Sequence, residues 1–222
     1  MKKSMTNLED AKKAGGSKYK EKILKTIEGY KDLSDEEKKC LHVYYGYGKG
    51  KTTCVMGLIM RALGAGLKVR LVQFDKGYEG KNEHYAELDT LRKLKEVGYD
   101  VDFFSTGCER MNEDGTFRFK NSDEDFKEAK RGLEIAKDLI VNGTQDLLIL
   151  DEAVAAVVYH LLEKKDIMEL IDLWEKNKRF EFVMTGHKIW DELEEKADLI
   201  TEMRKVKHYF DKGIPIRVGI DF

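Results

Sequence analysis

The chain has 222 residues, 41% of them hydrophobic and 37% charged, with a formal net charge of −2. This length can bury a substantial core, and the near-neutral charge gives no electrostatic footprint for nucleic acid. No apolar run approaches membrane-spanning length and no secretory signal is visible, so neither a membrane nor a nucleic acid is an expected partner. The three cysteines and five histidines are widely scattered, which favours a reducing cytoplasm and predicts no structural metal.

Residues 1–40 are rich in lysine and glutamate and form a predicted N-terminal extension. After Gly15 and Gly16, apolar residues at helical spacing (Ile23, Leu24 and Ile27) predict one amphipathic helix. A helical start and a partly disordered tail remain equally open for residues 1–17. We expect the remainder, 41–222, to form a single domain.

Beyond the extension, strand and helix patterns alternate. Strands are expected at 41–45, 68–74, 100–104, 147–150 and 180–185, and helices at 53–63, 82–97, 122–141, about 153–162 and 166–176, with a last helix before 198–203. Such alternation predicts an α/β fold with a mostly parallel central sheet between two helical layers. With the glycine-rich loop after the first strand, described next, the expected fold is a P-loop NTPase-like three-layer sandwich.

The segment after the first strand predicts a phosphate-binding loop. Glycines let successive backbone N–H groups face an anion, and the following helix adds the positive end of its dipole. The expected nucleotide-binding residues are Gly46, Tyr47, Gly48, Lys49, Gly50, Lys51, Thr52 and Thr53. The Lys51 ammonium would reach phosphate oxygens, and the Thr52 hydroxyl is a predicted Mg²⁺ ligand. The loop is one residue shorter than the common form, with Tyr45 where the first glycine usually stands.

Two further polar sites follow strands. The apolar run 147–150 ends in Asp151 and Glu152, which places carboxylates at the carboxyl edge of the sheet, where ligands of α/β proteins bind. Asp151 is a predicted Mg²⁺ ligand. Glu152 is a candidate that would hold a ligating water or act as a base, and the sequence leaves both open. Gln73 ends the second strand and is as well explained by a structural role as by nucleotide contact. The basic segment from 201 onward predicts a strand end and a hairpin-like tail.

Together these residues resemble the phosphate-loop ATP:corrinoid adenosyltransferases, which act on cob(I)alamin or cob(I)yrinic acid a,c-diamide. The anchors are G-Y-G-K-G-K-T-T at 46–53, V-Q-F-x-K-G at 72–77, L-D-E at 150–152, T-G at 185–186, A-D-L-I-T-E-M-R at 197–204, V-K-H at 206–208 and the terminal G-I-D-F. The family's loop is also one residue short, so the unusual spacing agrees with the resemblance.

The resemblance implies that 41–222 is one P-loop nucleotide- and corrinoid-binding domain. It implies attack of a Co(I) corrinoid on C5′ of ATP, with release of tripolyphosphate. It implies that the loop and Lys51 hold the phosphates, that Thr52 and Asp151 hold Mg²⁺, and that Glu152 lies nearby. It also implies a homodimer whose N-terminal segment helps to cover the corrinoid, and a reductase that supplies electrons.

The chain departs from the family pattern at three places. In the family, an aromatic pair often follows the third strand and helps to exclude the lower axial ligand of the corrinoid. This chain has Cys108, Glu109, Arg110 and Met111 in that place. Alanines and valines at 153–157 replace polar and aromatic positions, and His187 stands where an arginine is usual. These departures leave two alternatives open, a P-loop ATPase or phosphoryl transferase and a non-catalytic ATP-binding regulatory module.

Overall fold

The computed structural model describes residues 18–77, 85–110, 112, 116 and 118–221. The chain divides into two compact units, with the boundary between Lys39 and Cys40. In the described part of the first unit, the predicted amphipathic helix is present as α2 (Lys18–Asp32), with an ion pair of 3.5 Å between Glu21 and Lys25 one turn apart.

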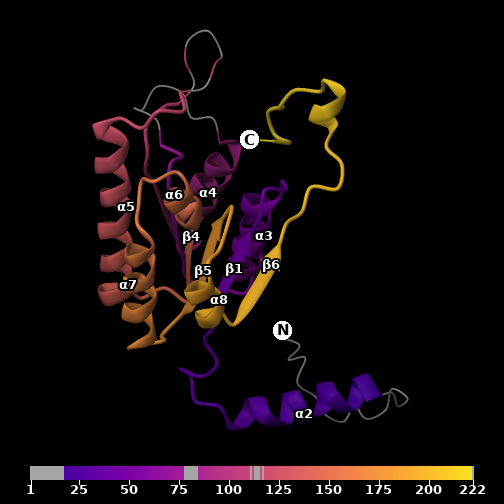
Figure 1. Cartoon of the computed structure of the whole chain (residues 1–222). Coiled ribbons are helices and arrows are strands. Elements are labelled where there is room, and N and C mark those ends of the chain that lie inside the picture. The colour runs from indigo at the N-terminus through magenta and orange to yellow at the C-terminus, as the bar shows by residue number, and fades with distance from the viewer. Residues whose placement is uncertain (1–17, 78–84, 111, 113–115, 117, 222) are drawn as a thin grey trace. The chain divides into compact units, whose positions relative to one another are not determined.

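The second unit is built on a six-stranded sheet with the order β3-β2-β4-β5-β1-β6 (Figure 1). Every strand pair in this sheet is parallel. The strands are β1 (Leu41–Tyr45), β2 (Val69–Gln73), β3 (Val101–Ser105), β4 (Leu147–Asp151), β5 (Glu181–Gly186) and β6 (Leu199–Glu202). All five residues of β4 are buried, as expected for a strand covered on both faces. The predicted α/β fold is confirmed.

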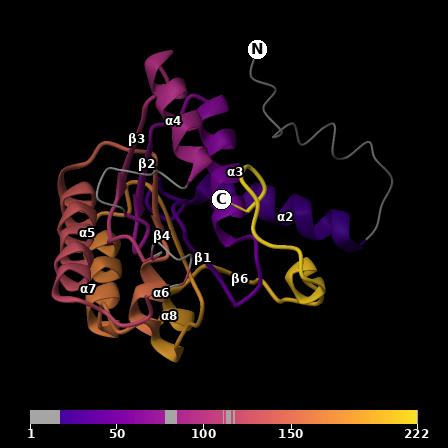
Figure 2. The same ribbon diagram turned by 90° about the horizontal axis from the view of Figure 1, so that it is seen from above.

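Helices cover both faces of this sheet (Figure 2). They are α3 (Lys51–Gly64), α4 (Ala86–Glu96), α5 (Asp123–Asn142), α6 (Ala153–Val158), α7 (Lys164–Glu175) and α8 (Asp191–Lys196). One core cluster joins the sheet to α5, α6, α7 and α8, and a second joins it to α3 and α4. Helix α5 begins as the sequence predicts, because the Ser122 side chain caps it and Asp125 completes a capping box. In the described residues, no helix has the length and apolar character needed to cross a membrane.

Several details differ from the sequence-based expectations, among them the start of α7 at Lys164 instead of 166. Helix α3 begins at Lys51, two residues early. Helix α6 ends at Val158 instead of 162, because the chain turns there and His160 adopts a left-handed conformation with φ of 58°. The expected hairpin-like tail is wrong: β6 lies parallel to β1, and the chain continues into a short 3-10 helix, η1 (Tyr209–Lys212). The expected helix start at 82 lies outside the described residues.

The parallel arrangement brings the chemistry-bearing segments to one edge of the sheet. Because all strands run in the same direction, their carboxyl ends meet there. The glycine loop follows β1, Asp151 ends β4, and Gln73 and Gly186 end β2 and β5. This edge therefore holds the candidate site.

Candidate functional site

The loop between β1 and α3 has a shape that requires glycine. Gly46 and Gly50 have φ of 117° and 122°, which side-chain-bearing residues rarely adopt. A Cβ on Gly48 would lie 2.5 Å from the carbonyl oxygen of Met203. The Gly48 N–H donates to that same oxygen at 2.8 Å, and the Met203 N–H donates to Tyr45 O at 2.7 Å. The loop is therefore fixed against the segment that follows β6.

Lys51, the first residue of α3, folds back across the loop. Its buried ammonium donates to the carbonyl oxygens of Gly46 at 2.8 Å and Gly48 at 3.3 Å. Burial lowers the pKa of Lys51, and the nearby carboxylates of Glu152 and Asp151 oppose this effect. The predicted phosphate-binding lysine thus lies at the loop, where an anion would stabilise its charge.

Asp151 is the centre of a buried hydrogen-bond cluster. Its carboxylate accepts from Lys76 Nζ at 2.6 Å, from Thr185 Oγ1 at 2.7 Å and from Thr52 Oγ1 at 3.2 Å. Burial would raise the pKa of Asp151, but the Lys76 ammonium and these donors outweigh it and hold the pKa below its ordinary value. The two predicted metal ligands, Thr52 and Asp151, are therefore brought together.

Lys76 is a site residue to which the sequence analysis gave no role, although it quoted the motif that contains it. Its Nζ also donates to Thr52 Oγ1 at 2.7 Å and lies 5.1 Å from the centre of the Tyr85 ring. Burial would lower the pKa of Lys76, but the charges of Asp151 and Glu152 raise it above its usual value. The signal that points to Lys76 is its place just beyond the end of β2, which pairs with β4.

Glu152 has a left-handed backbone, with φ of 61°, and its N–H lies 2.8 Å from Thr185 Oγ1. Burial and the neighbouring Asp151 raise the pKa of the Glu152 carboxyl. The carboxylate lies 3.9 Å from His187 Nε2, and His187 Nδ1 is hydrogen-bonded to the Tyr159 hydroxyl at 3.0 Å. Burial, and to a lesser degree the charge of Lys51, lowers the pKa of His187. Glu152 and His187 therefore form one polar group beside Asp151.

Gln73 is fully buried at the end of β2, in register with Asp151 and Ser105. Its Oε1 accepts from Ser105 Oγ at 3.0 Å, whereas its Nε2 has no hydrogen-bond partner among the described residues. Nucleotide contact by Gln73 stays a prediction, and its unpaired amide group is compatible with one.

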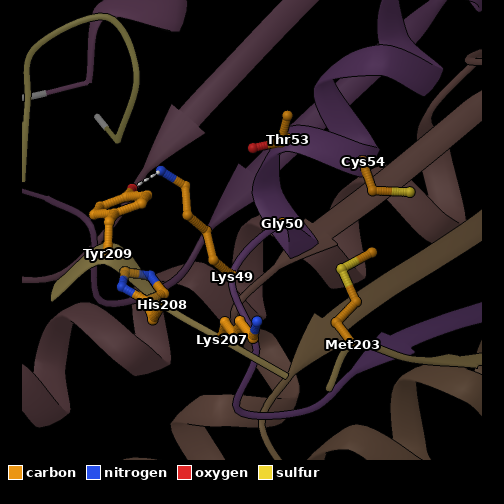
Figure 3. Close-up of a pocket in the computed structure, with 8 residues that line it drawn as sticks. All are labelled: Lys49, Gly50, Thr53, Cys54, Met203, Lys207, His208 and Tyr209. Atoms are coloured by element: carbon orange, nitrogen blue, oxygen red, sulfur yellow. Dashed lines mark hydrogen bonds between the residues drawn. The ribbon is translucent and has the colours of Figure 1, made fainter. Parts of the chain in front are cut away.

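A cavity of about 570 Å³ adjoins the outer side of the loop (Figure 3). Lys49 crosses this region and donates to Tyr209 Oη at 2.8 Å and to Ile220 O at 2.9 Å, and it pairs with Asp221. The cavity is lined by Lys49, Gly50, Thr53, Cys54, Met203, Lys207, His208 and Tyr209. The ammonium of Lys49, one of the predicted nucleotide-binding residues, is therefore already bonded to the C-terminal segment. Thr53 is exposed in this cavity, and Tyr47 is exposed and stacks on His187 with ring centres 5.3 Å apart.

A second cavity, of about 590 Å³, adjoins the site at Lys76 and Glu152. Lys76, Glu152, Tyr159 and His187 line it, together with the segment 108–110. Its lining combines apolar and aromatic side chains with charged ones, and small-molecule sites also place polar groups among apolar side chains. This cavity therefore lies directly beside the phosphate-binding edge of the sheet.

Where the family pattern has an aromatic pair, this cavity has a thiol and an ion pair. Cys108 is buried, which raises its pKa to about 11. Arg110 Nε lies 2.7 Å from Asp75 Oδ1. Phe119, which is 90% exposed, brings an aromatic ring to the lining of this cavity from another segment. Met111 lies outside the described residues.

The fold and the site define a class of protein. A parallel α/β sheet carries a glycine loop after β1 and a buried aspartate at the end of β4, with β5 between these two strands. This arrangement is that of a phosphate-loop nucleotide-binding protein.

The comparisons with known proteins give the family. The model of the family described as "ATP:corrinoid adenosyltransferase BtuR/CobO/CobP" matches residues 37–222, and the chain belongs to this family. It is 29% identical over 189 residues to the corrinoid adenosyltransferase of Escherichia coli K12, covering 85% of this chain and 88% of the relative. For the Pseudomonas aeruginosa corrinoid adenosyltransferase the identity is 33% over 187 residues, covering 84% and 85%. Corrinoid adenosyltransferase CobA of Salmonella typhimurium is 26% identical over 202 residues, covering 91% and 95%.

Proposed function

We propose that the protein transfers the 5′-deoxyadenosyl group of ATP to the Co(I) ion of a corrinoid, in the synthesis or salvage of adenosylcobalamin. The observation that carries this proposal is the position of the second cavity against the phosphate site. Lys76 lines that cavity and also bonds to Thr52 and Asp151. ATP with its triphosphate on the loop would present its ribose to a ligand in the cavity, so that a Co–C5′ bond forms as the C5′–O bond breaks and tripolyphosphate leaves.

In this reaction the protein has to position the two substrates and stabilise the leaving triphosphate. It has no need to remove a proton. Co(I) is itself a strong nucleophile, so the rate depends on holding C5′ over cobalt and on neutralising the leaving triphosphate. The Lys51 ammonium would do the latter, together with backbone N–H groups of 46–51 other than those of Gly46 and Gly48, which are bonded to carbonyl oxygens. Glu152 would act by orienting polar groups or a water beside Asp151, since no general base is required.

The residues at the site fit a magnesium ion. Thr52 Oγ1 and Asp151 Oδ2 lie 3.2 Å apart, close to the ~3 Å that separates neighbouring ligands of octahedral Mg²⁺. Bound there, the ion would neutralise part of the triphosphate charge. The Lys76 ammonium, which bonds to both oxygens, would then be free to face a phosphate oxygen instead.

The test is an anaerobic incubation of the protein with ATP, Mg²⁺ and a chemically reduced corrinoid. We expect the spectrum of an alkylcorrinoid to appear together with tripolyphosphate. If a folded, ATP-binding protein yields neither product, the proposal is wrong. Release of orthophosphate would favour an ATPase or phosphoryl transferase, and ATP binding without turnover would favour a regulatory module.

We also propose that the protein acts in the cytoplasm as a homodimer, with a separate reductase supplying electrons to the corrinoid. The family resemblance supports these partners. Light scattering on the purified protein tests the dimer: a monomeric mass at micromolar concentration would contradict it.

A further inference from the structure

Three metal-ligating side chains converge at the amino-terminal edge of the sheet, opposite the phosphate site. Cys40 precedes β1, His42 lies within β1, and Glu181 begins β5. The parallel register pairs Leu41 with Phe182, which sets Cys40 level with Glu181. Because side chains alternate along a strand, Cys40 and His42 lie on one face, and Glu181 shares that face.

The ligand atoms of these three residues are already close together. One sulfur, nitrogen or carboxylate oxygen from each lies within 4.8 Å of the other two. His42 Nε2 is 3.4 Å from Glu181 Oε2, and the Cys40 N–H donates to that oxygen at 3.1 Å. The backbone bond therefore orients the carboxylate toward the other two groups.

A second observation concerns the other nitrogen of the His42 ring. His42 Nδ1 is buried and has no hydrogen-bond partner among the described residues. Buried polar atoms of this kind are uncommon and call for an explanation. The His42 side chain is 20% exposed and that of Glu181 34%, so the cluster is enclosed but open to an ion from solvent.

The chemistry of the three donors selects the ion. Mg²⁺ and Ca²⁺ take oxygen ligands, whereas a thiolate, an imidazole and a carboxylate together suit Zn²⁺. Zinc ligands in a tetrahedron lie roughly 3.3–3.8 Å apart, so small side-chain rotations would bring these atoms to their places. We propose that Cys40, His42 and Glu181 bind a Zn²⁺ ion, with the fourth position open to water.

Such an ion would fasten the start of β1 to the start of β5. It would lie at the opposite end of the strands from Lys51 and Asp151, so its effect is on stability and it takes no part in the reaction. An ion that binds only the folded state stabilises it in proportion to the logarithm of the ion concentration over Kd.

Co²⁺ is the probe that tests the site, because a thiolate ligand gives it a sulfur-to-metal charge-transfer band. Co²⁺ at the phosphate site would have only oxygen ligands and would lack this band. We expect the full-length protein, stripped of metal by a chelator, to develop the band and visible tetrahedral bands with one equivalent of Co²⁺. Zn²⁺ should abolish both and raise the unfolding temperature.

Variants show which cysteine gives rise to the charge-transfer band. Cys40→Ser should remove it and His42→Gln should weaken Co²⁺ binding about ten-fold or more. The matched control, Cys54→Ser, alters a free thiol beside the phosphate loop and should leave the band unchanged. Circular dichroism checks that each variant is folded. If Cys40→Ser does not fold, the weakened Co²⁺ binding of His42→Gln tests the site in its place. A wild-type protein without the band, or a band that survives Cys40→Ser and disappears in Cys54→Ser, overturns the proposal.

Discussion

Asp151 and Lys76 determine the electrostatics of the phosphate site, because the charge of each is buried against that of the other. The Asp151 side chain is fully buried and that of Lys76 is 10% exposed, with the charged atoms 2.6 Å apart. A buried pair of this kind is costly to break from one side, because the remaining charge has no partner. The pair also keeps Thr52 and Asp151 in place before any ligand arrives.

We therefore predict that Asp151→Asn lowers the free energy of unfolding by about 3–5 kcal/mol, because Lys76 is left buried and unpaired. Lys76→Met in the same chain should restore most of that loss but none of the adenosylation activity. Urea unfolding of the wild type, both single variants and the double variant measures the coupling. Additive losses in the double variant would contradict it.

Lys51→Ala should remove most of the activity, by about 10²–10³-fold in kcat, because the leaving triphosphate loses its buried cation. The rate of alkylcorrinoid formation under saturating ATP measures this effect. Lys68→Ala is the matched control, since Lys68 is exposed and remote from the loop in sequence. Near-normal turnover of Lys51→Ala would exclude the loop from the mechanism.

Glu152 should make stability depend on pH with a defined sign. Its folded pKa is raised above 4.5, mainly by burial, so the ionised carboxylate disfavours the folded state above that folded pKa. The disadvantage disappears as the pH falls below 4.5, where both states are protonated. Glu152→Gln should therefore unfold at a higher urea concentration than the wild type at pH 7, and the gap should close near pH 4. A gap that widens at low pH would show that the sign is wrong.

At the scale of elements, the phosphate loop depends on β6, since Gly48 approaches the Met203 carbonyl too closely for any side chain. Gly48→Ala should cost about 1–3 kcal/mol of stability and weaken ATP binding, because Met203 would have to move. Gly57→Ala, on the exposed face of α3 with open space around its Cα, should instead stabilise the protein by about 0.5–1 kcal/mol. Thermal unfolding and ATP titration of both variants test this contrast, and equal effects would contradict it.

The sequence was sufficient for features that depend on local pattern. The strand–loop–helix order around 46–53 and the apolar strand before Asp151 predict elements and site residues that the structure places together. The contact of Gly48 with Met203 and the bond of Lys76 to Asp151 join segments far apart in the chain, so no local pattern reports them. The early end of α6 at Val158 depends on the left-handed turn at His160, and a lone histidine in the sequence does not mark such a turn.

The cluster of Cys40, His42 and Glu181 also joins segments far apart in the chain, so local sequence pattern does not predict it. Cysteine and histidine alternate at 40 and 42, but the third ligand comes from a neighbouring strand late in the chain, so the sequence predicted no structural metal. Strand register, which fixes Cys40 opposite Glu181, is a property of the folded sheet.

At the scale of the whole molecule, the two compact units differ in what they contain. All of the described sheet, both cavities and every predicted site residue belong to the unit 40–222. A chain that begins at residue 37 should therefore fold on its own, with cooperative urea unfolding and an ATP affinity equal to that of the full chain. Loss of cooperative unfolding in this fragment would show that the second unit depends on the first.

The position of β6 has a consequence for the order of events during protein synthesis. β6 is made last among the strands, yet it pairs with β1, the first, and is followed by the Met203 carbonyl that the loop binds. On the ribosome, the glycine loop emerges long before residues 199–203. A growing chain therefore carries its phosphate loop without the backbone that contacts Gly48, and we expect nucleotide capture to follow translation of the last strand.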